Sequence, residues 1–76
     1  MAEYAPAPLT VANSATSKVI THSLSNSNAV LRCCLCEGWP GAPFISARDA
    51  NTITVTFINQ VPASGTYKLD VWVKEP

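Results

Sequence analysis

The chain has 76 residues, of which 47% are apolar and only 13% are charged. This length allows one small domain and excludes large enzyme folds such as a (β/α)₈ barrel or a doubly wound nucleotide-binding domain. Five basic and five acidic side chains give a formal net charge of +0. The chain therefore lacks the positive charge expected of a nucleic-acid-binding protein, and no net charge keeps its copies apart.

The first nine residues are predicted to form an extended N-terminal arm, followed by one domain over residues 10–76. Pro6 and Pro8 oppose a helix and lack the N–H that a strand ladder requires. Tyr4 and Leu9 are large apolar side chains that a free arm would have little reason to carry. We expect them to dock across a neighbouring subunit or an underlying lattice, and we treat both as interface candidates.

No targeting or membrane segment is expected. The N-terminus lacks a basic region followed by an apolar run, so it does not fit a signal peptide. No stretch approaches the ~20 apolar residues of a membrane-spanning helix. These features indicate a protein made in a cytoplasm, with neither a membrane nor a nucleic acid as its partner.

The first half of the chain reads as strands separated by turns. Residues 17–22 are rich in β-branched side chains and predict a first strand. Residues 29–37 predict a second strand that is apolar on both faces, a pattern typical of a strand covered on both sides. Residues 38–43 contain two glycines and two prolines and predict a loop, and residues 44–47 predict a short third strand.

The second half shows the clearest alternation. In residues 52–57 three threonines alternate with Ile53, Val55 and Phe57, which predicts a strand with one buried face. Residues 66–73 alternate in the same way, with Trp72 on the outward side. No window has a sustained helical period, so we expect almost no helix.

These elements predict an all-β protein: a small antiparallel sandwich or barrel of about four to six strands. The predicted core consists of the apolar residues that face inward on these strands. It comprises Val19, Leu31, Leu35, Ile45, Ile53, Val55, Phe57, Tyr67, Leu69, Val71 and Val73. Such a core is thin for an independent domain, which favours oligomerisation.

The three cysteines lie in one run, Cys33, Cys34 and Cys36, which is a poor disulfide framework. On a strand, Cys34 and Cys36 share a face and Cys33 points to the other, which splits a chelate. Tetrahedral zinc requires four ligands, and His22 is the chain's one histidine. We expect reduced, metal-free thiols in a core strand, although a metal or redox site and a subunit interface are the alternatives.

No catalytic constellation can be recognised. His22 has no acidic partner nearby in the sequence, so we expect its imidazole to bond the backbone of the turn after the first strand. We expect no enzyme activity and no cofactor. Trp39 and Trp72 are candidates for a subunit interface or for stacking on a sugar. The structural alternatives are Trp39 folded back over the sandwich edge and Trp72 packed against the arm.

The order of three segments resembles a known family. They are Ile20-Thr21-His22-Ser23-Leu24, then Asp49-Ala50-Asn51-Thr52-Ile53-Thr54-Val55-Thr56-Phe57, then Pro62-Ala63-Ser64-Gly65-Thr66-Tyr67. The arrangement resembles small β-sandwich modules of tailed-bacteriophage virion proteins, both capsid-attached accessory proteins and tail-fibre tips. The cysteines, and the loop over residues 37–43, depart from that pattern. The resemblance implies a virion structural role and trimeric association, and it supplies no catalytic residues.

These observations lead to the expected function. We expect a non-enzymatic capsid decoration or accessory protein that binds the major capsid protein or a tail protein as a homo-oligomer, most simply a trimer. A fibre tip would follow a long shaft, and the sequence contains none. The alternatives are a tail-fibre-tip module that binds a receptor or carbohydrate, and a small metal-binding module that uses the cysteines.

Overall fold

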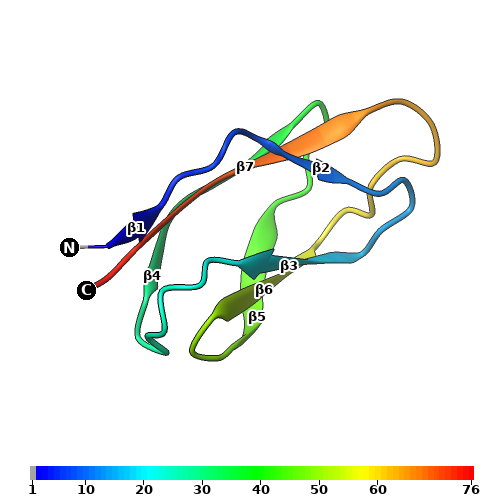
Figure 1. Cartoon of the computed structure of the whole chain (residues 1–76). Helices are drawn as coiled ribbons and strands as arrows, with labels where there is room; N and C mark the ends of the chain where they lie inside the picture. The colour runs from blue at the N-terminus through cyan, green and yellow to red at the C-terminus, as the bar shows by residue number, and fades with distance from the viewer. Residues whose placement is uncertain (1) are drawn as a thin grey trace.

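The computed structural model describes residues 2–76, which form seven strands in two antiparallel sheets that pack face to face (Figure 1). Sheet A contains β1 (Glu3–Tyr4), β2 (Leu9–Val11), β4 (Val30–Glu37) and β7 (Tyr67–Lys74). Sheet B contains β3 (Ser17–Thr21), β5 (Pro43–Arg48) and β6 (Thr52–Phe57). The predicted all-β antiparallel class is confirmed. Over residues 2–76, no helix is long and apolar enough to cross a bilayer.

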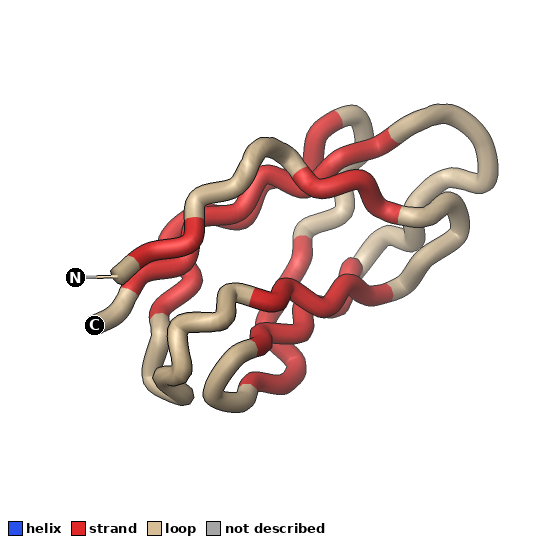
Figure 2. Tube along the Cα trace, in the orientation of Figure 1, coloured by secondary structure: helices blue, strands red, loops and turns tan. Residues whose placement is uncertain are grey.

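Strand β7 is the centre of sheet A. Strand β4 pairs along one side of β7, from Val30 opposite Lys74 to Glu37 opposite Lys68. Strands β1 and β2 pair along its other side, at opposite ends. Figure 2 shows the two short strands as one interrupted path beside β7, with both chain termini at the same end of the molecule.

The N-terminal segment is therefore an edge strand of its own sheet, and the prediction that it cannot form a ladder is wrong. Tyr4 pairs with Val73, and Leu9 pairs with Leu69. The prolines do not prevent this pairing because Pro6 and Pro8 fall between the two short strands. Proline is tolerated at an edge, where one side of the strand needs no partner.

The loop after β2 fixes this edge strand to the rest of the chain. The amide nitrogen of Asn13 donates to the carbonyl oxygens of Pro62 (3.0 Å) and Gly65 (2.9 Å). In return, the side-chain amide of Gln60 donates to the carbonyl of Ser14 at 2.6 Å. These bonds hold the N-terminal segment in the fold of its own chain.

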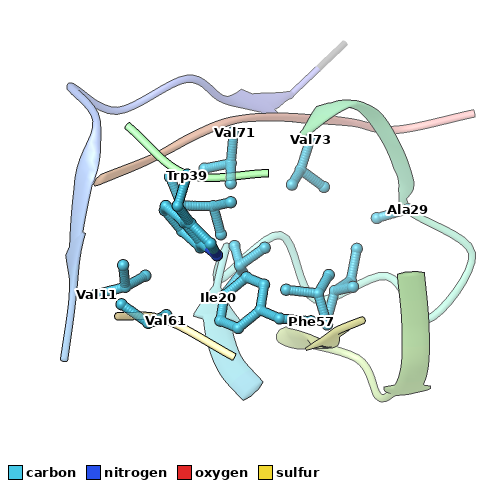
Figure 3. Packing of buried hydrophobic residues seen from close by; sticks show 11 residues of the cluster. Val11, Ile20, Ala29, Trp39, Phe57, Val61, Val71 and Val73 are labelled. Atoms are coloured by element: carbon cyan, nitrogen blue, oxygen red, sulfur yellow. The ribbon is translucent and has the colours of Figure 1, made fainter. Parts of the chain in front are cut away.

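Strand β6 is the centre of sheet B and shows the predicted alternation. Ile53, Val55 and Phe57 are buried, and the threonines between them lie on the outer side. Strand β3 pairs along one side of β6, and β5 pairs along the other. The core between the sheets is drawn in Figure 3. It consists of Val11, Ile20, Ala29, Trp39, Ile53, Val55, Phe57, Val61, Leu69, Val71 and Val73.

Three predicted core residues lie at the surface instead. Val19 is 54% exposed because its neighbour Ile20 points into the core. Leu35 is 61% exposed because β4 shifts register between Leu31 and Cys33, and the extra residue changes which side chains face inward. Ile45 is 38% exposed on β5, an edge strand that only one neighbour covers.

Two basic side chains bridge the sheets at opposite sides of the sandwich. Lys18 on β3 lies in register with buried Val55, and its ammonium donates to the carbonyl of Thr10 in β2 at 3.4 Å. Arg48 on β5 lies in register with buried Ile53. Its guanidinium donates to the carbonyl of Ala29, just before β4, at 3.0 Å.

Each edge of the two sheets also carries a feature that disfavours pairing with another chain. The first edge is interrupted at Pro6 and Pro8, and β3 has an inward-pointing lysine. Strand β4 is bulged near Arg32, and β5 begins at Pro43 and is bulged near Ser46. Prolines, bulges and inward charges are the devices that block edge-to-edge association. The four sheet edges are therefore poor sites for the addition of a further strand.

Candidate functional site

Trp39 lies inside the core and not on the surface. Its indole is 6% exposed and sits between the sheets (Figure 3). The ring meets Phe57 edge-on with centroids 5.3 Å apart, and Tyr67 edge-on with centroids 5.8 Å apart. Its Nε1 donates to the carbonyl of Asn59 at 3.2 Å. Trp39 therefore has no free face for a sugar or a subunit, and the loop folds back over the sandwich.

The loop around Trp39 is tightly packed. A Cβ atom at Gly41 would lie 2.6 Å from the Trp39 Nε1 and 2.7 Å from the Cys36 Sγ, so a larger residue would force these packed side chains to shift. The carbonyl of Gly41 accepts a hydrogen bond from the backbone of Ile58 at 2.9 Å. The segment is a loop, as its two glycines and two prolines predicted, and the close approach at Gly41 allows the indole of Trp39 to be buried.

Trp72 is the aromatic residue that stays at the surface. It is 40% exposed on the outer side of β7, and its Nε1 donates to a carboxylate oxygen of Glu3 at 2.8 Å. The ammonium of Lys74 lies 5.4 Å from the centroid of its ring, within range of a cation–π contact. The indole thus packs against the N-terminal strand, which is the structural alternative that the sequence offered.

Tyr4 and Leu9 lie at the edge of the core of their own chain. Both are partly buried and pack against the buried cluster. Their backbones pair with β7, so these side chains are already used inside the sandwich. The structure places them as packing residues of sheet A, and the neighbouring subunit expected to cover them is not needed.

The cysteines are divided between the two faces of β4, as predicted. Cys34 pairs with Val71 and Cys36 with Leu69 on the inner face, whereas Cys33 pairs with Trp72 on the outer face. All three are free thiols. No cluster of three or more metal-ligating side chains occurs within residues 2–76. The division of the thiols between opposite faces works against a common metal ion.

The pKa values of the two inner thiols, Cys34 and Cys36, are raised. Burial raises the pKa of the Cys34 thiol from 9.0 to about 11, and the neighbouring Cys36 and Cys33 add to the shift. Burial also raises the pKa of Cys36, although the backbone amides of Gly41 and Ala42 oppose this effect. A nucleophilic cysteine needs a stabilised thiolate, so the environment of these two thiols does not favour such chemistry.

His22 is a structural residue of the turn after β3. It is 3% exposed, and its Nδ1 accepts a hydrogen bond from the backbone of Leu24 at 3.1 Å. The predicted bond to turn backbone is confirmed. Its Nε2 is buried without a hydrogen-bond partner. Within the part of the chain that the structure describes, no pocket opens beside it or elsewhere.

Two of the three segments that carried the resemblance meet at this turn. The carbonyl of Asn51 accepts from the backbones of His22 (2.8 Å) and Ser23 (3.2 Å). Its side-chain oxygen accepts from the backbone of Ser25 at 3.0 Å. Asp49 closes the turn between β5 and β6, because its carboxylate accepts hydrogen bonds from the backbones of Asn51 and Thr52, both at 2.9 Å. These motif residues hold two turns together.

The outer faces of the two sheets have opposite character, and this contrast is the main candidate functional feature. The outer face of sheet A carries charges of both signs. They are Glu3, Glu37, Lys68, Asp70 and Lys74. Leu35 and Trp72 are the exposed apolar side chains among these charges.

The strand residues on the outer face of sheet B are all uncharged, and the carboxylate of Asp49 lies at one end of this face, beside Thr52. These strand residues are Ser17, Val19, Thr21, Phe44, Ser46, Ala47, Thr52, Thr54 and Thr56. Ile58, which directly follows β6, is also exposed. Val19, Phe44 and Ile58 are 54%, 50% and 68% exposed.

Sequence reasoning missed these residues as candidates. The sequence pattern places Val19 in the core and gives no reason to single out Phe44 and Ile58. A signal for the face was present in the alternation of β6, because the side opposite Ile53 and Val55 contains no charged residue. Its neighbours on β3 and β5 could not be placed until the register was known.

Comparison with protein-family models, with curated proteins and with solved structures finds no match to this chain.

Proposed function

We propose that this chain is a non-enzymatic structural module that attaches to the surface of a tailed-phage particle as a homo-oligomer. The order of its sequence motifs supports the phage assignment. The structural support is a single observation: large apolar side chains remain exposed on a sandwich whose own core is filled. They are Val19, Leu35, Phe44, Ile45, Ile58 and Trp72.

Exposed apolar surface of this kind marks places where other protein surfaces bind. The closed strand edges support the same conclusion, because they leave the outer faces as the available contact surfaces. A decoration protein needs such faces for the underlying lattice and for neighbouring copies. A trimer is the oligomer that we propose, and its partner is the major capsid protein or a tail protein.

The carbohydrate-binding alternative loses one of its two stacking candidates, because Trp39 is buried. Trp72 keeps an accessible indole between Glu3 and Lys74. We retain a tail-tip role as the second candidate on that observation. The metal-binding alternative has little support because the cysteines occupy opposite faces of β4.

Labelling of phage particles tests the proposal directly. Antibodies raised against the purified chain are applied to particles whose genome encodes it, and bound gold is located by electron microscopy. Regular labelling of the head is expected for a decoration protein, and labelling confined to the tail tip would favour the second candidate. Particles that carry the chain at neither place would overturn a virion role.

A further inference from the structure

We propose that the outer face of sheet B pairs with the same face of a second copy, about a two-fold axis that runs along β6. The proposal goes beyond the virion role and concerns the isolated chain in solution. It starts from the distribution of charge. Glu3, Glu37, Lys68, Asp70 and Lys74 lie on the outer face of sheet A, whereas the strand residues on the outer face of sheet B carry no charge and Asp49 is confined to the turn at its end.

An uncharged surface disfavours partners that carry charged groups. A partner that brought charged groups against this face would strip them of water without supplying counter-charges, which is costly. The strand residues of the same face on another copy bring no charge. The chain also has a formal net charge of +0, so no long-range repulsion opposes the approach of two copies.

The arrangement of side chains suits a two-fold axis. One row crosses the sheet from Val19 through Thr54 to Ala47. Rotation about β6 places β3 of one copy over β5 of the other, so the larger Val19 faces the smaller Ala47 of its partner. Thr54 faces its own counterpart near the axis. Large side chains opposite small ones are the complementarity that packed sheets require.

The adjacent row supplies the aromatic contact. It crosses from Ser17 through Thr56 to Phe44, which is half exposed. The hydroxyl of Thr56 donates to that of Ser46 at 2.9 Å, and the Ser46 hydroxyl lies 3.3 Å from the carbonyl of Thr54. These polar groups are already partly satisfied within the sheet, so covering them with another copy costs less than covering free hydroxyls.

The size of the face sets the strength of the pairing. Three strands about 4.8 Å apart and seven residues of about 3.3 Å each give a footprint of roughly 300 Å² per copy. A stable interface buries about 800 Å² per partner. The pairing is therefore weak in dilute solution and becomes important where copies are concentrated, as on a repeating surface. This contact differs from the head-to-tail contacts that would close a trimer.

Sedimentation velocity of the full chain tests the pairing. Over about 10 µM to about 1 mM, a range suited to a weak interface, the wild type should shift from monomer toward dimer. Thr54→Lys and Thr54→Glu should each weaken the association at least about tenfold, since each places like charges beside the axis. An equimolar mixture of the two variants should restore it, because opposite charges then meet.

Thr10→Lys is the matched control, since Thr10 is an exposed threonine in register with Lys68 on the outer face of sheet A, and it should associate like the wild type. Circular dichroism checks that each variant folds. Val19→Lys, at a position that is more than half exposed, replaces the Thr54 variants if they do not. A wild type that stays monomeric, a Thr10→Lys variant that loses association, or a trimer that withstands Thr54→Lys and Val19→Lys would each overturn the proposal. None of these results depends on particle labelling, so the two proposals can fail separately.

Discussion

The Trp39 indole lies edge-on against the Phe57 ring, with ring centroids 5.3 Å apart and ring planes at 78°. The contact joins the loop after β4 to the end of β6, and so connects the two sheets. Edge-to-face aromatic pairs add about 0.5–1.5 kcal/mol beyond the area that they bury. The loop that the sequence suggested as a surface site is thus a component of the core.

Replacement of Trp39 should therefore destabilise the fold. Trp39→Ala is expected to lower the free energy of unfolding by roughly 3–5 kcal/mol, because it leaves a large cavity between the sheets. Trp39→Phe should cost less because it keeps an aromatic ring. Urea denaturation followed by circular dichroism measures both. The control is Trp72→Phe on the outer face, and a Trp39→Ala variant as stable as this control would contradict the assignment of Trp39 to the core.

The cysteines should react in the order that their positions dictate. Cys33 on the outer face should be alkylated by iodoacetamide before Cys34, because burial raises the pKa of Cys34 to about 11. Mass spectrometry of partly labelled protein measures the order, with Cys33→Ser as the control that removes the fast site. Faster labelling of Cys34 than of Cys33 would contradict the placement of these thiols.

The same pKa shift makes stability depend on alkaline pH. An unperturbed cysteine thiol has a pKa of 9.0, whereas the pKa of Cys34 in the folded chain is about 11. As the pH rises, the unfolded chain therefore loses this proton first. The stabilising contribution is complete below pH 9 and is lost as the pH rises toward 11. Melting temperatures across this window should fall more for the wild type than for Cys34→Ala. Parallel curves for the two proteins would count against a protonated, buried Cys34.

Asp49 should stabilise its turn above acidic pH. Backbone N–H groups of Asn51 and Thr52, together with the Thr52 hydroxyl, hold the pKa of this carboxyl below its ordinary value of 3.8. Its contribution is therefore present above about pH 3.8 and is lost as the pH falls through the lower folded-state value. Asp49→Ala should be less stable than wild type at pH 7, and the difference should shrink in acid. A difference that does not change with pH would exclude the carboxylate as its source.

The strands with strict alternation could be read directly from the sequence, and the others could not. In β6 and β7 every second residue is apolar, so the buried face was predicted correctly. In β3 two β-branched residues, Val19 and Ile20, are adjacent. Either one could face inward, and choosing the wrong one reverses every side chain of the strand. The inward Lys18 adds to the ambiguity, because its role in bridging the sheets depends on Thr10 in another strand.

The remaining errors have non-local causes. The bulge between Leu31 and Cys33 turns Leu35 outward, and a bulge depends on the register with β7 and not on the local pattern. The N-terminal strand finds its partner at the opposite end of the chain, where Tyr4 pairs with Val73. The uncharged face likewise arises from three strands whose order along the sheet differs from their order in the sequence.

Substitutions at Val19 and Ile20, which are adjacent in β3, test which of the two side chains faces the core. Val19→Thr should change the free energy of unfolding by no more than about 0.5 kcal/mol, as is usual at an exposed site. Ile20→Thr should cost roughly 2–4 kcal/mol, because it removes buried apolar atoms and buries a hydroxyl group. Chemical denaturation of the two variants makes the comparison. Equal costs at the two positions would show that the strand is not oriented as described.

The most direct test of the account is a concentration series of ¹H–¹⁵N NMR spectra of the wild-type chain, because it maps self-association residue by residue. The account predicts that amide signals move with concentration on the outer face of sheet B, above all at Val19, Phe44 and Thr54. It also predicts that signals at Leu35 and Asp70, on the outer face of sheet A, stay in place. Shifts confined to sheet A, or spectra that do not change up to the solubility limit, would contradict the claim that the uncharged face is the contact surface.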